Sequence, residues 1–415
     1  MRTLRTFITA ALLVGAASGA AHANAFYLSE HDAEATGRAF ANAATDDQPS
    51  AIVYNPGGVA VGEGTAISIG GSLVVANAAF TPDGGTKFDT TNQPAVLPQL
   101  FVTSRVHDLI AVGVGFYAPF GLAIAWPNDA PTADVIQRQS LRTYFISPVI
   151  GINLNKYVPG LTVGGGVDIV PSTVELNQAI YFGQDRGSVH LGGTATGFGG
   201  RVGVQYHPAA LKALQVGVMY RTAVQEDYTG TGNFDAPAQY RAQLPPDGDI
   251  TTSVKMPQSI SGGVSYRPIE ALQVEADLSW VGWSSFQQLD IKLPNMTTQT
   301  VQEQYQDTTT VRVGVEYAMA AQHLALRAGY IYDPTPIKPQ FLTAQLPDAN
   351  RHDLTAGATY QIAPGYHVAL GLLYVLPASR AATATTTMPN QPEYQGTYDI
   401  SAFVASLSLR GRFGK

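Results

Sequence analysis

Apolar and polar residues alternate with a period of two over long stretches of this chain. From Leu272 to Trp280, Leu, Val, Ala and Trp occupy one face, and Gln, Glu, Asp and Ser occupy the other. Successive side chains of a β-strand point to opposite faces, so this segment is a strand with one apolar and one charged face. The apolar face packs on a core in a soluble sandwich, whereas it faces lipid in an outer-membrane barrel, whose interior is polar. Similar alternation predicts strands over 214–221, 311–317 and 324–330.

The two ends of the chain favour the barrel. The chain opens with two arginines, an apolar run over 7–20 and Ala21-His22-Ala23. This order predicts a secretory signal peptide spanning residues 1–23. Beyond it, no stretch approaches the ~20 apolar residues of a transmembrane helix. Residues 400–413 alternate up to Phe413 and resemble the closing strand of bacterial outer-membrane barrels, although Gly414 and Lys415 follow the aromatic residue.

Short and long polar breaks separate the predicted strands in strict alternation. The short breaks are at 105–108, 155–159, 207–210, 267–270, 318–322 and 363–365. The long breaks are near 79–94, 120–139, 178–191, 229–249, 290–301, 334–349 and 379–396. Short periplasmic turns and long outer loops are typical of bacterial barrels, and seven long loops imply about fourteen strands. We therefore predict an all-β fold, a transmembrane antiparallel up-and-down β-barrel over residues 63–415.

Composition agrees with a barrel and excludes several kinds of chemistry. Charged residues make up only 13% of the chain, and Gly (42) and Tyr (20) are abundant, as expected for twisted strands and an interfacial aromatic girdle. The absence of Cys excludes disulfides, thiolate metal sites and a Cys nucleophile. The eight His residues form no metal or hydrolase motif, and the glycines at 164–166 lie within a predicted strand rather than a phosphate loop. We expect no metal, no cofactor, no nucleic-acid partner and no enzymatic activity.

Residues 24–62 precede the first predicted strand and read differently. Residues 30–44 are rich in Ala and compatible with a helix, and Asn55-Pro56-Gly57 breaks any regular element. Fourteen strands enclose a space that needs a plug or leaves a pore. Because the segment includes apolar residues such as Phe26, Phe40 and Ile52, we expect it to fold into the lumen as a plug, called the hatch below, rather than to form a disordered tail.

Several motifs together resemble the FadL family of outer-membrane transporters for long-chain fatty acids and toluene- or xylene-type hydrocarbons. The hatch shares with that family the stretches 24–30, 37–39 and 44–47, and Tyr54-Asn55-Pro56-Gly57, where the family typically has Asn-Pro-Ala. Later segments that are similar to family members cover 220–230, 283–289, 332–336 and 346–351. The likeness spans nearly the whole chain after the signal.

The resemblance implies a route for hydrophobic molecules. Family members capture substrate at outer loops, pass it to an internal apolar pocket and release it sideways through a gap at a kinked third strand. Transfer of a hydrophobic molecule from water into lipid is favourable by about 0.8 kcal/mol of free energy per CH₂ group, so lateral release is physically reasonable. On this basis Phe26, Tyr27 and Leu28 line or seal the pocket, and Asn55, Pro56 and Gly57 shape the hatch near the gap.

The third strand is expected at 108–119. Gly113 and Gly115 lie near its middle, and Gly within a strand often marks a bulge or a close approach of backbones. They are candidates for the gap, although ordinary packing in a Gly-rich barrel explains them as well. The next loop is unusually apolar for an exposed segment, so we interpret it as part of an outer capture groove. A self-packed loop is an equally good alternative. Its candidate substrate-binding residues are Phe120, Leu122, Ile124 and Trp126.

A fatty-acid substrate would need a cation for its carboxylate, preferably Arg. Candidates are Arg38 on the hatch and Arg312, Arg327 and Arg351 on lumen-facing strand positions. Pairing of these arginines with internal carboxylates is the competing explanation. If all are neutralised internally, an uncharged hydrocarbon is the better ligand.

The sequence therefore predicts a monomeric transporter of hydrophobic small molecules in the Gram-negative outer membrane, in contact with lipid and lipopolysaccharide. A general porin, an adhesin and, less favoured, an outer-membrane lipid hydrolase are the alternatives. Neither the choice between fatty acid and neutral hydrocarbon nor the substrate length follows from the sequence.

Overall fold

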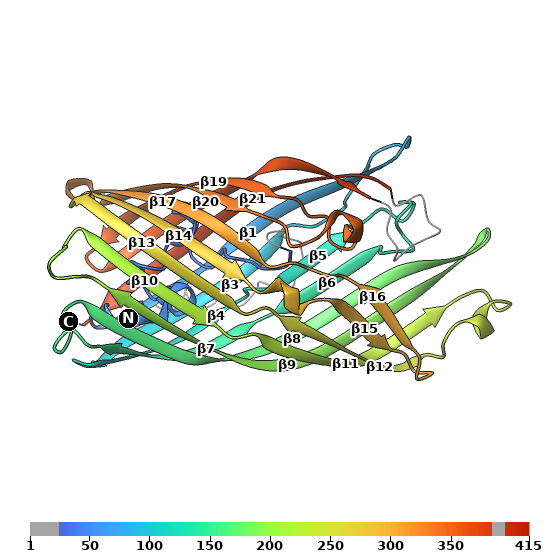
Figure 1. Cartoon of the computed structure of the whole chain (residues 1–415), viewed down its shortest axis with the longest axis horizontal. Coiled ribbons are helices and arrows are strands. Elements are labelled where there is room, and N and C mark those ends of the chain that lie inside the picture. The colour runs from blue at the N-terminus through green and yellow to red at the C-terminus, as the bar shows by residue number, and fades with distance from the viewer. Residues whose placement is uncertain (1–24, 384–394, 415) are drawn as a thin grey trace, which may run out of the picture.

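A computed structural model describes residues 25–383 and 395–414 of the chain (Figure 1). The predicted signal peptide and part of the last long loop lie outside these residues. The described strands form one closed antiparallel barrel of fourteen strands, which confirms the predicted fold class. No helix within the described residues is long and apolar enough to cross a membrane.

Eight wall strands are continuous and six are each interrupted once. In chain order they are β1 (Thr65–Pro82), β3 (Ala95–His107), β4 (Ile110–Tyr117) with β5 (Gly121–Ala125), β6 (Arg138–Thr143) with β7 (Phe145–Asn153), β8 (Leu161–Phe182), β9 (Asp185–Tyr206), β10 (Leu214–Arg221) with β11 (Val224–Asp235), β12 (Gly248–Met256) with β13 (Ser259–Ile269), β14 (Leu272–Val281) with β15 (Gln288–Lys292), β16 (Thr298–Gln302) with β17 (Thr308–Met319), β18 (Leu324–Asp333), β19 (Arg351–Ala363), β20 (Tyr366–Ala382) and β21 (Gly396–Phe413). The two-residue β2 (Phe88–Asp89) pairs with the outer end of β1.

The last strand closes the barrel on the first. Residues of β21 pair with β1 along its whole length, from Thr65 opposite Phe413 to Pro82 opposite Gly396. The C-terminus lies at one end of the barrel and the long hairpins extend at the other (Figure 1). The closing role predicted for residues 400–413 is therefore confirmed.

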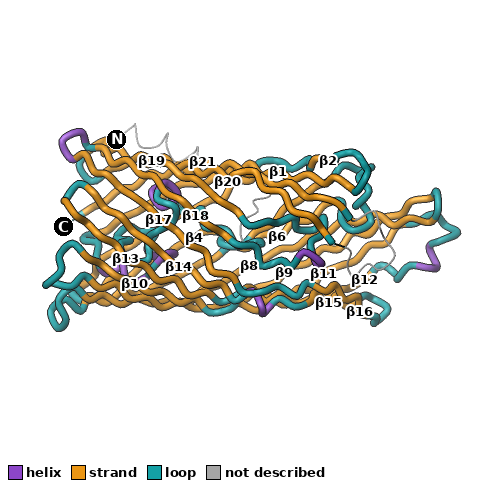
Figure 2. The backbone as a smooth tube through the Cα atoms, turned by 45° about the horizontal axis from the view of Figure 1, so that its top comes forward, coloured by secondary structure: helices purple, strands orange, loops and turns teal. Residues whose placement is uncertain are grey.

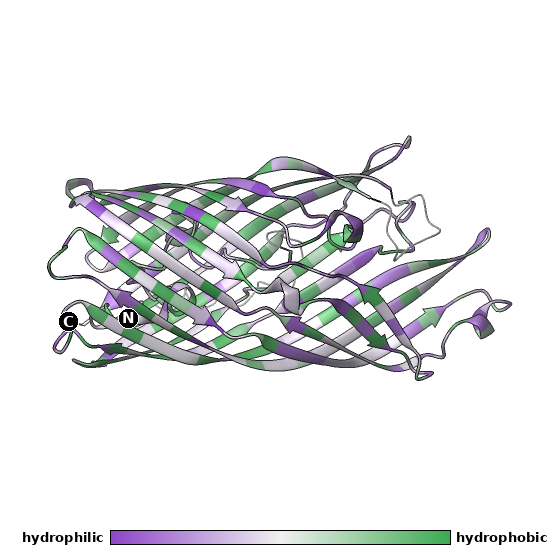
Figure 3. Cartoon of the chain, in the orientation of Figure 1, coloured by the Kyte–Doolittle hydropathy of each residue, from purple (hydrophilic) through white to green (hydrophobic). Residues whose placement is uncertain are grey.

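Side-chain burial along β14 follows the predicted alternation. Gln273, Glu275 and Asp277 are buried, whereas Leu278 is 57% exposed. Figure 3 shows hydrophobic and hydrophilic residues alternating along the strands in this way. Charges inside and aliphatic side chains outside are the arrangement of a barrel wetted by lipid.

One predicted outer loop is instead strand. Residues 178–191 extend the hairpin of β8 and β9, which turns only at Gly183 (φ +66°) and Gln184. A second apolar cluster near the outer end explains the extension, because it gives these strands a core of their own. It contains Val189, Leu191, Phe234, Ile250 and Ile291.

The hatch fills the lumen with short helices rather than one long one (Figure 2). They are α1 (Ala33–Gly37), α2 (Ala51–Tyr54) and the 3₁₀ helix η1 (Pro56–Ala60). Residues 30–44 are compatible with a single helix, but the observed helix ends at Gly37. Ala39 and Phe40, which follow it, adopt φ values of 56° and 57°. Packing against the wall overrides helix propensity here, since a Cβ on Gly37 would lie 2.8 Å from the Cα of Gly357. Shorter 3₁₀ turns outside the hatch are η2 (Arg241–Gln243), η3 (Trp283–Ser285), η4 (Ala320–Gln322) and η5 (Pro339–Phe341).

Buried carboxylates of β14 hold the hatch backbone. Asp277 accepts hydrogen bonds from the backbone N–H groups of Asn42 and Ala43, both at 2.9 Å, and Glu275 accepts one from Ala44 at 2.7 Å. These bonds satisfy backbone donors that the irregular hatch cannot pair internally. Charges on the inner face of the wall therefore position the plug.

Candidate functional site

The hatch begins beside a break in the third wall strand. This strand stops at Tyr117 and resumes at Gly121, and the hatch backbone fills part of the interruption. Tyr27 is the bridge partner of Phe120. The N–H of Leu28 donates to the Pro119 carbonyl at 2.8 Å, and the N–H of Gly121 donates to the Phe26 carbonyl at 3.0 Å.

The same break opens the hydrogen-bonded wall. The ladder between β3 and β4 ends at the pair Leu100 and Phe116, and β5 pairs with β6. Within the described residues no ladder joins β5 to β3, whose outer residues pair with β1. Bonds from Thr91 to the Ala125 carbonyl and from the Ala125 N–H to Asn92, both at 2.8 Å, bridge the outer end of this opening.

Gly113 and Gly115 lie where the wall is continuous. Both pair with β3 on one side and β7 on the other. A Cβ on Gly115 would lie 2.9 Å from Ile52 of the hatch, and one on Gly113 would lie 3.1 Å from the same side chain. The two glycines thus permit close approach of the hatch, and the break lies beyond them.

An apolar cavity of about 100 Å³ lies behind Phe26. Phe26 contacts Trp283 edge-on at 4.7 Å between ring centroids and Phe286 at 5.8 Å. The outer segments after β14, β16 and β18 fold inward to complete the lining. The lining residues include Leu122, Leu141, Val174, Leu176, Val254, Leu289, Tyr305, Ile337, Phe341 and Leu346. No Lys, Arg or His lines the cavity within the part of the chain that the structure describes.

Glu303 is the acid of the inward-folded segment at this cavity. Burial raises the pKa of Glu303 to about 8, against its hydrogen bond with Tyr305. Burial also raises the pKa of nearby Asp348. Near neutral pH Glu303 is therefore mostly protonated, and the cavity wall that it contributes is uncharged.

The sequence predicted that the apolar segment after the break is an exposed loop, but the structure shows that it is not. Phe120, Leu122, Ile124 and Trp126 are all at least nine-tenths buried, and most of the segment forms β5. Leu122 lines the cavity, and the indole N–H of Trp126 donates to the Ala344 carbonyl at 2.9 Å. Inward packing on the folded-in loops replaces exposure to solvent, so an exposed capture groove is not formed by these side chains.

The hatch motif at 55–57 contacts a different part of the wall. The Asn55 side chain donates to the carbonyls of Ala43 at 2.6 Å and Val204 at 3.0 Å, and it accepts from the Gly57 N–H at 3.0 Å. A Cβ on Gly164 would lie 2.0 Å from the Pro56 carbonyl oxygen. These contacts fix η1 against β8 and β9 rather than against β5.

Two of the four predicted arginines are paired with carboxylates. Arg327 contacts Glu316 at 2.7 Å and Glu34 of the hatch at 2.9 Å. Arg351 is paired with Asp333 and lies 3.9 Å from Asp353. Internal pairing, the competing explanation for these residues, accounts for both.

The other two predicted arginines have polar, uncharged hydrogen-bond partners. Arg38 donates to Asn42 at 3.3 Å, with Glu275 among the carboxylates around it. Arg312 donates to the Ser29 hydroxyl at 3.0 Å and lies 5.7 Å from the Phe40 ring. Neither lines the apolar cavity.

Sequence reasoning missed much of the cavity. The lining residues Phe286 and Tyr305 lie in the breaks of interrupted strands, and Phe341 lies in a long loop, so strand periodicity assigns none of them a face. The spacing of aromatic residues at 283 and 286, within a segment that resembles the family, was the available signal. Arg221, buried next to Tyr27 and Phe120, was also missed.

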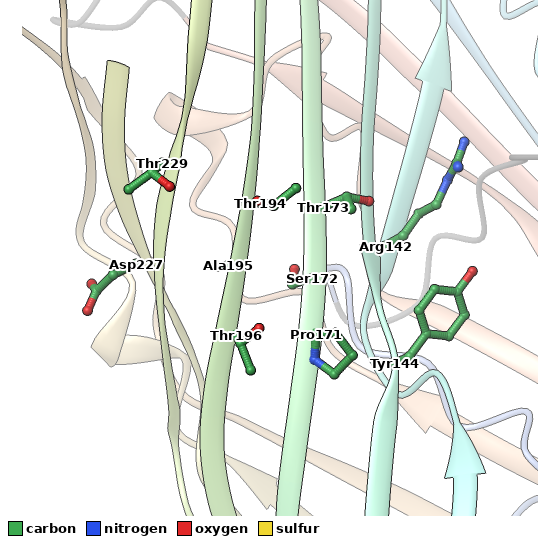
Figure 4. Close-up of a pocket in the computed structure, with 10 residues that line it drawn as sticks. All are labelled: Arg142, Tyr144, Pro171, Ser172, Thr173, Thr194, Ala195, Thr196, Asp227 and Thr229. Atoms are coloured by element: carbon green, nitrogen blue, oxygen red, sulfur yellow. The ribbon is translucent and has the colours of Figure 1, made fainter. Parts of the chain in front are cut away.

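A second, larger groove of about 450 Å³ has a different character (Figure 4). Thr173, Thr194 and Thr229 lie side by side on β8, β9 and β11, with Asp227 and Arg142 near them. The threonines and Asp227 are exposed. Hydroxyl groups dominate this lining, so the groove does not suit a hydrocarbon.

Comparisons with known proteins agree with this geometry. A family model described as "Outer membrane protein transport protein (OMPP1/FadL/TodX)" matches residues 14–413. The chain is 26% identical to outer membrane protein P1 of Haemophilus influenzae, covering 86% of this chain and 87% of the relative. It is 24% identical to the long-chain fatty acid transport protein of Salmonella typhi, covering 90% and 92%.

Solved structures share the fold. A FadL homologue from Pseudomonas aeruginosa superposes with a TM-score of 0.83 at 18% identity, covering 94% of this chain and all of that one. The toluene transporter TbuX of Ralstonia pickettii superposes with a TM-score of 0.73 at 20% identity, covering 93% and 99%.

Proposed function

Because this chain belongs to the OMPP1/FadL/TodX family of outer membrane transport proteins, we propose that it moves hydrophobic small molecules into the membrane through the break beside β5. The protein is an outer-membrane β-barrel. Its substrates are long-chain fatty acids or hydrocarbons; long-chain fatty acids and the aromatic hydrocarbon toluene are the molecules named for its relatives.

One observation supports the route above all. The hatch residue that lines the apolar cavity, Phe26, is also hydrogen-bonded to Gly121 at the break. Movement of this one segment would therefore open the cavity and the wall together. Capture at the outer loops, transfer to the cavity and lateral exit follow in that order.

The filled lumen argues against a general porin. A porin conducts through a water-filled channel, whereas the hatch here is buried and bonded to several strands. Residues 24–62 act as this plug and residues 63–415 as the barrel. A single chain contains the whole route, so the protein acts as a monomer, with lipid and lipopolysaccharide around its wall.

Uptake of radiolabelled oleate and toluene, in a strain lacking its own transporter, tests the proposal. The decisive variant deletes residues 118–120, which joins Tyr117 to Gly121 and keeps Leu122 facing inward. We expect this variant to fold but to take up neither substrate. A matched three-residue deletion at 295–297, in the exposed turn between β15 and β16, should leave uptake intact. Normal uptake by the 118–120 deletion, or no uptake by the unaltered protein, would contradict the proposal.

A further inference from the structure

Two arginines face each other across neighbouring wall strands. Arg201 of β9 and Arg221 of β10 are register partners, and both side chains are buried in the lumen. Like charges directly opposite each other in a sheet repel. Only Arg201 is neutralised, since it contacts Asp168 at 2.7 Å and also donates to the Ile52 carbonyl at 2.7 Å.

Arg221 has no carboxylate partner among the described residues. Its Nε and Nη2 atoms are buried without any hydrogen-bond partner. The neighbouring His31 does not change this balance, because burial first, and then Arg221 and Arg201, lower its pKa to about 3 and keep it neutral. The cluster thus contains two guanidinium groups and one carboxylate.

Aromatic rings surround Arg221 in place of an anion. Its guanidinium carbon lies 4.9 Å from the ring centre of Phe120, 5.0 Å from Tyr27 and 5.9 Å from Phe145. Such contacts attract the cation to the ring faces. Burying an unpaired ion is costly, and the cage offsets this cost only in part. A residue maintained at such a cost is best explained by an anion that binds there.

Two of the three cage residues also seal the wall. Tyr27 and Phe120 are the bridge partners at the break, and Phe26, next to Tyr27, lines the apolar cavity. Withdrawal of the hatch N-terminus would therefore uncover Arg221 and widen the cavity at once. The cavity needs to widen, because at about 100 Å³ it is smaller than the ~150 Å³ cavity known to admit benzene.

We propose that Arg221 is a latent site for the carboxylate of an anionic amphiphile, uncovered when Tyr27 withdraws. The inference rests on the proposed function and narrows its substrate class. A carboxylate would accept two parallel hydrogen bonds from the guanidinium, including one from a donor that is now unsatisfied. The apolar tail would then extend into the widened cavity, which has no competing cation.

Binding to the purified full-length protein tests this assignment. Calorimetry with oleate, 4-octylbenzoate and oleyl alcohol separates the head group from the tail. In Arg221→Gln we expect affinity for both carboxylates to fall at least tenfold, and affinity for the alcohol to change by less than twofold. Arg221→Lys should be intermediate, because it keeps the charge but loses the paired donors. A loss confined to oleate would show that Arg221 does not bind carboxylates in general, and would contradict the assignment.

Stability and uptake separate this role from a structural one. Arg221→Gln removes an unpaired buried cation, so its melting temperature should equal or exceed that of the unaltered protein. Arg105→Gln, which removes an Arg bonded to the Gly62 carbonyl at 3.0 Å, is the matched control and should bind oleate normally. Equal loss of acid and alcohol binding, unchanged oleate binding, or a lower melting temperature in Arg221→Gln would overturn the assignment. Uptake of toluene by that variant would show that the proposed function stands even where the assignment fails.

Discussion

Tyr27 of the hatch and Phe120 of the interrupted strand form an isolated antiparallel β-bridge, with their ring centroids 5.4 Å apart. The hydrogen bonds on either side of this pair come from the adjacent residues, so Tyr27 and Phe120 form a non-hydrogen-bonded pair. In such pairs the Cα atoms are about 4.5 Å apart, within the range that a disulfide spans.

A cross-link at this position should therefore lock the route. The double variant Tyr27→Cys, Phe120→Cys introduces the only two thiols in the chain, which has no Cys of its own. When oxidised, it should take up neither oleate nor toluene, and reduction should restore uptake of the neutral substrate. Each single variant, treated with the same oxidant, is the control. Full uptake through the oxidised form would show that this contact need not open.

Close packing between hatch and wall makes a second prediction. Gly357→Ala on β19 places a methyl group against the backbone of Gly37, 2.8 Å away, so one of the two must move. Overpacking of this kind costs about 1–3 kcal/mol. We expect a lower melting temperature in detergent and larger ion conductance in planar bilayers as the hatch loosens.

Gly262→Ala on β13 is the matched control for this experiment. The nearest atom to a Cβ there is 3.7 Å away, so this variant should resemble the unaltered protein. Equal behaviour of the two variants would contradict tight packing between Gly37 and Gly357.

The barrel could be predicted from the sequence because its rule is local. Alternation fixes which face of each strand meets lipid, as Glu275 and Leu278 show on opposite faces of β14. Polar breaks then fix the turns. The assignment of residues 178–191 to a loop was wrong, because a second core beyond the membrane extends the strands around Val189 and obeys the same rule of alternation.

The site was harder to predict because it depends on contacts distant in sequence. Phe120 and Trp126 are apolar in a region expected to be exposed, and their burial follows from loops that fold inward hundreds of residues later. Pairing of Arg327 and Arg351 depends on hatch and strand neighbours that no spacing reveals. Arg221 differs from Arg327 and Arg351 in lacking a paired carboxylate within the described part of the chain. This difference becomes visible only when the positions of all neighbouring residues are known.

This difference leads to a third prediction, about Arg351. Arg351→Ala leaves Asp333 and Asp353 buried without their cation, and loss of one partner of a buried pair typically costs about 3–5 kcal/mol. We expect a marked fall in melting temperature and an equal reduction in uptake of oleate and toluene. Arg186→Ala, at an exposed position in the outer hairpin, should change neither. Selective loss of oleate uptake in a stable Arg351→Ala protein would instead make Arg351 a carboxylate-binding residue.

Two acids line the cavity, Glu303 and the exposed Glu175, and Glu303 makes binding depend on pH. Burial raises its pKa to about 8, so the carboxyl is mostly neutral at pH 7 and ionised at pH 9. An ionised group in an apolar cavity disfavours a neutral hydrocarbon, since its hydration is lost when the ligand displaces water. Toluene affinity should therefore be constant below pH 7 and fall by up to about tenfold at pH 9, where about one-tenth of the carboxyl remains protonated.

Glu303→Gln provides the control for this pH dependence, because it keeps the shape and a hydrogen-bond donor but does not ionise. Its toluene affinity should be the same at pH 6 and pH 9. The raised pKa also has a consequence for folding. The unfolded state loses this proton first, so stability should fall as the pH rises from about 4.5, the ordinary value, towards about 8. Burial raises the pKa of the neighbouring Tyr305 well above 10, so Tyr305 places no new charge there as the pH rises to 9. A fall in toluene affinity that persists in Glu303→Gln would assign the effect to another group and contradict the role of Glu303.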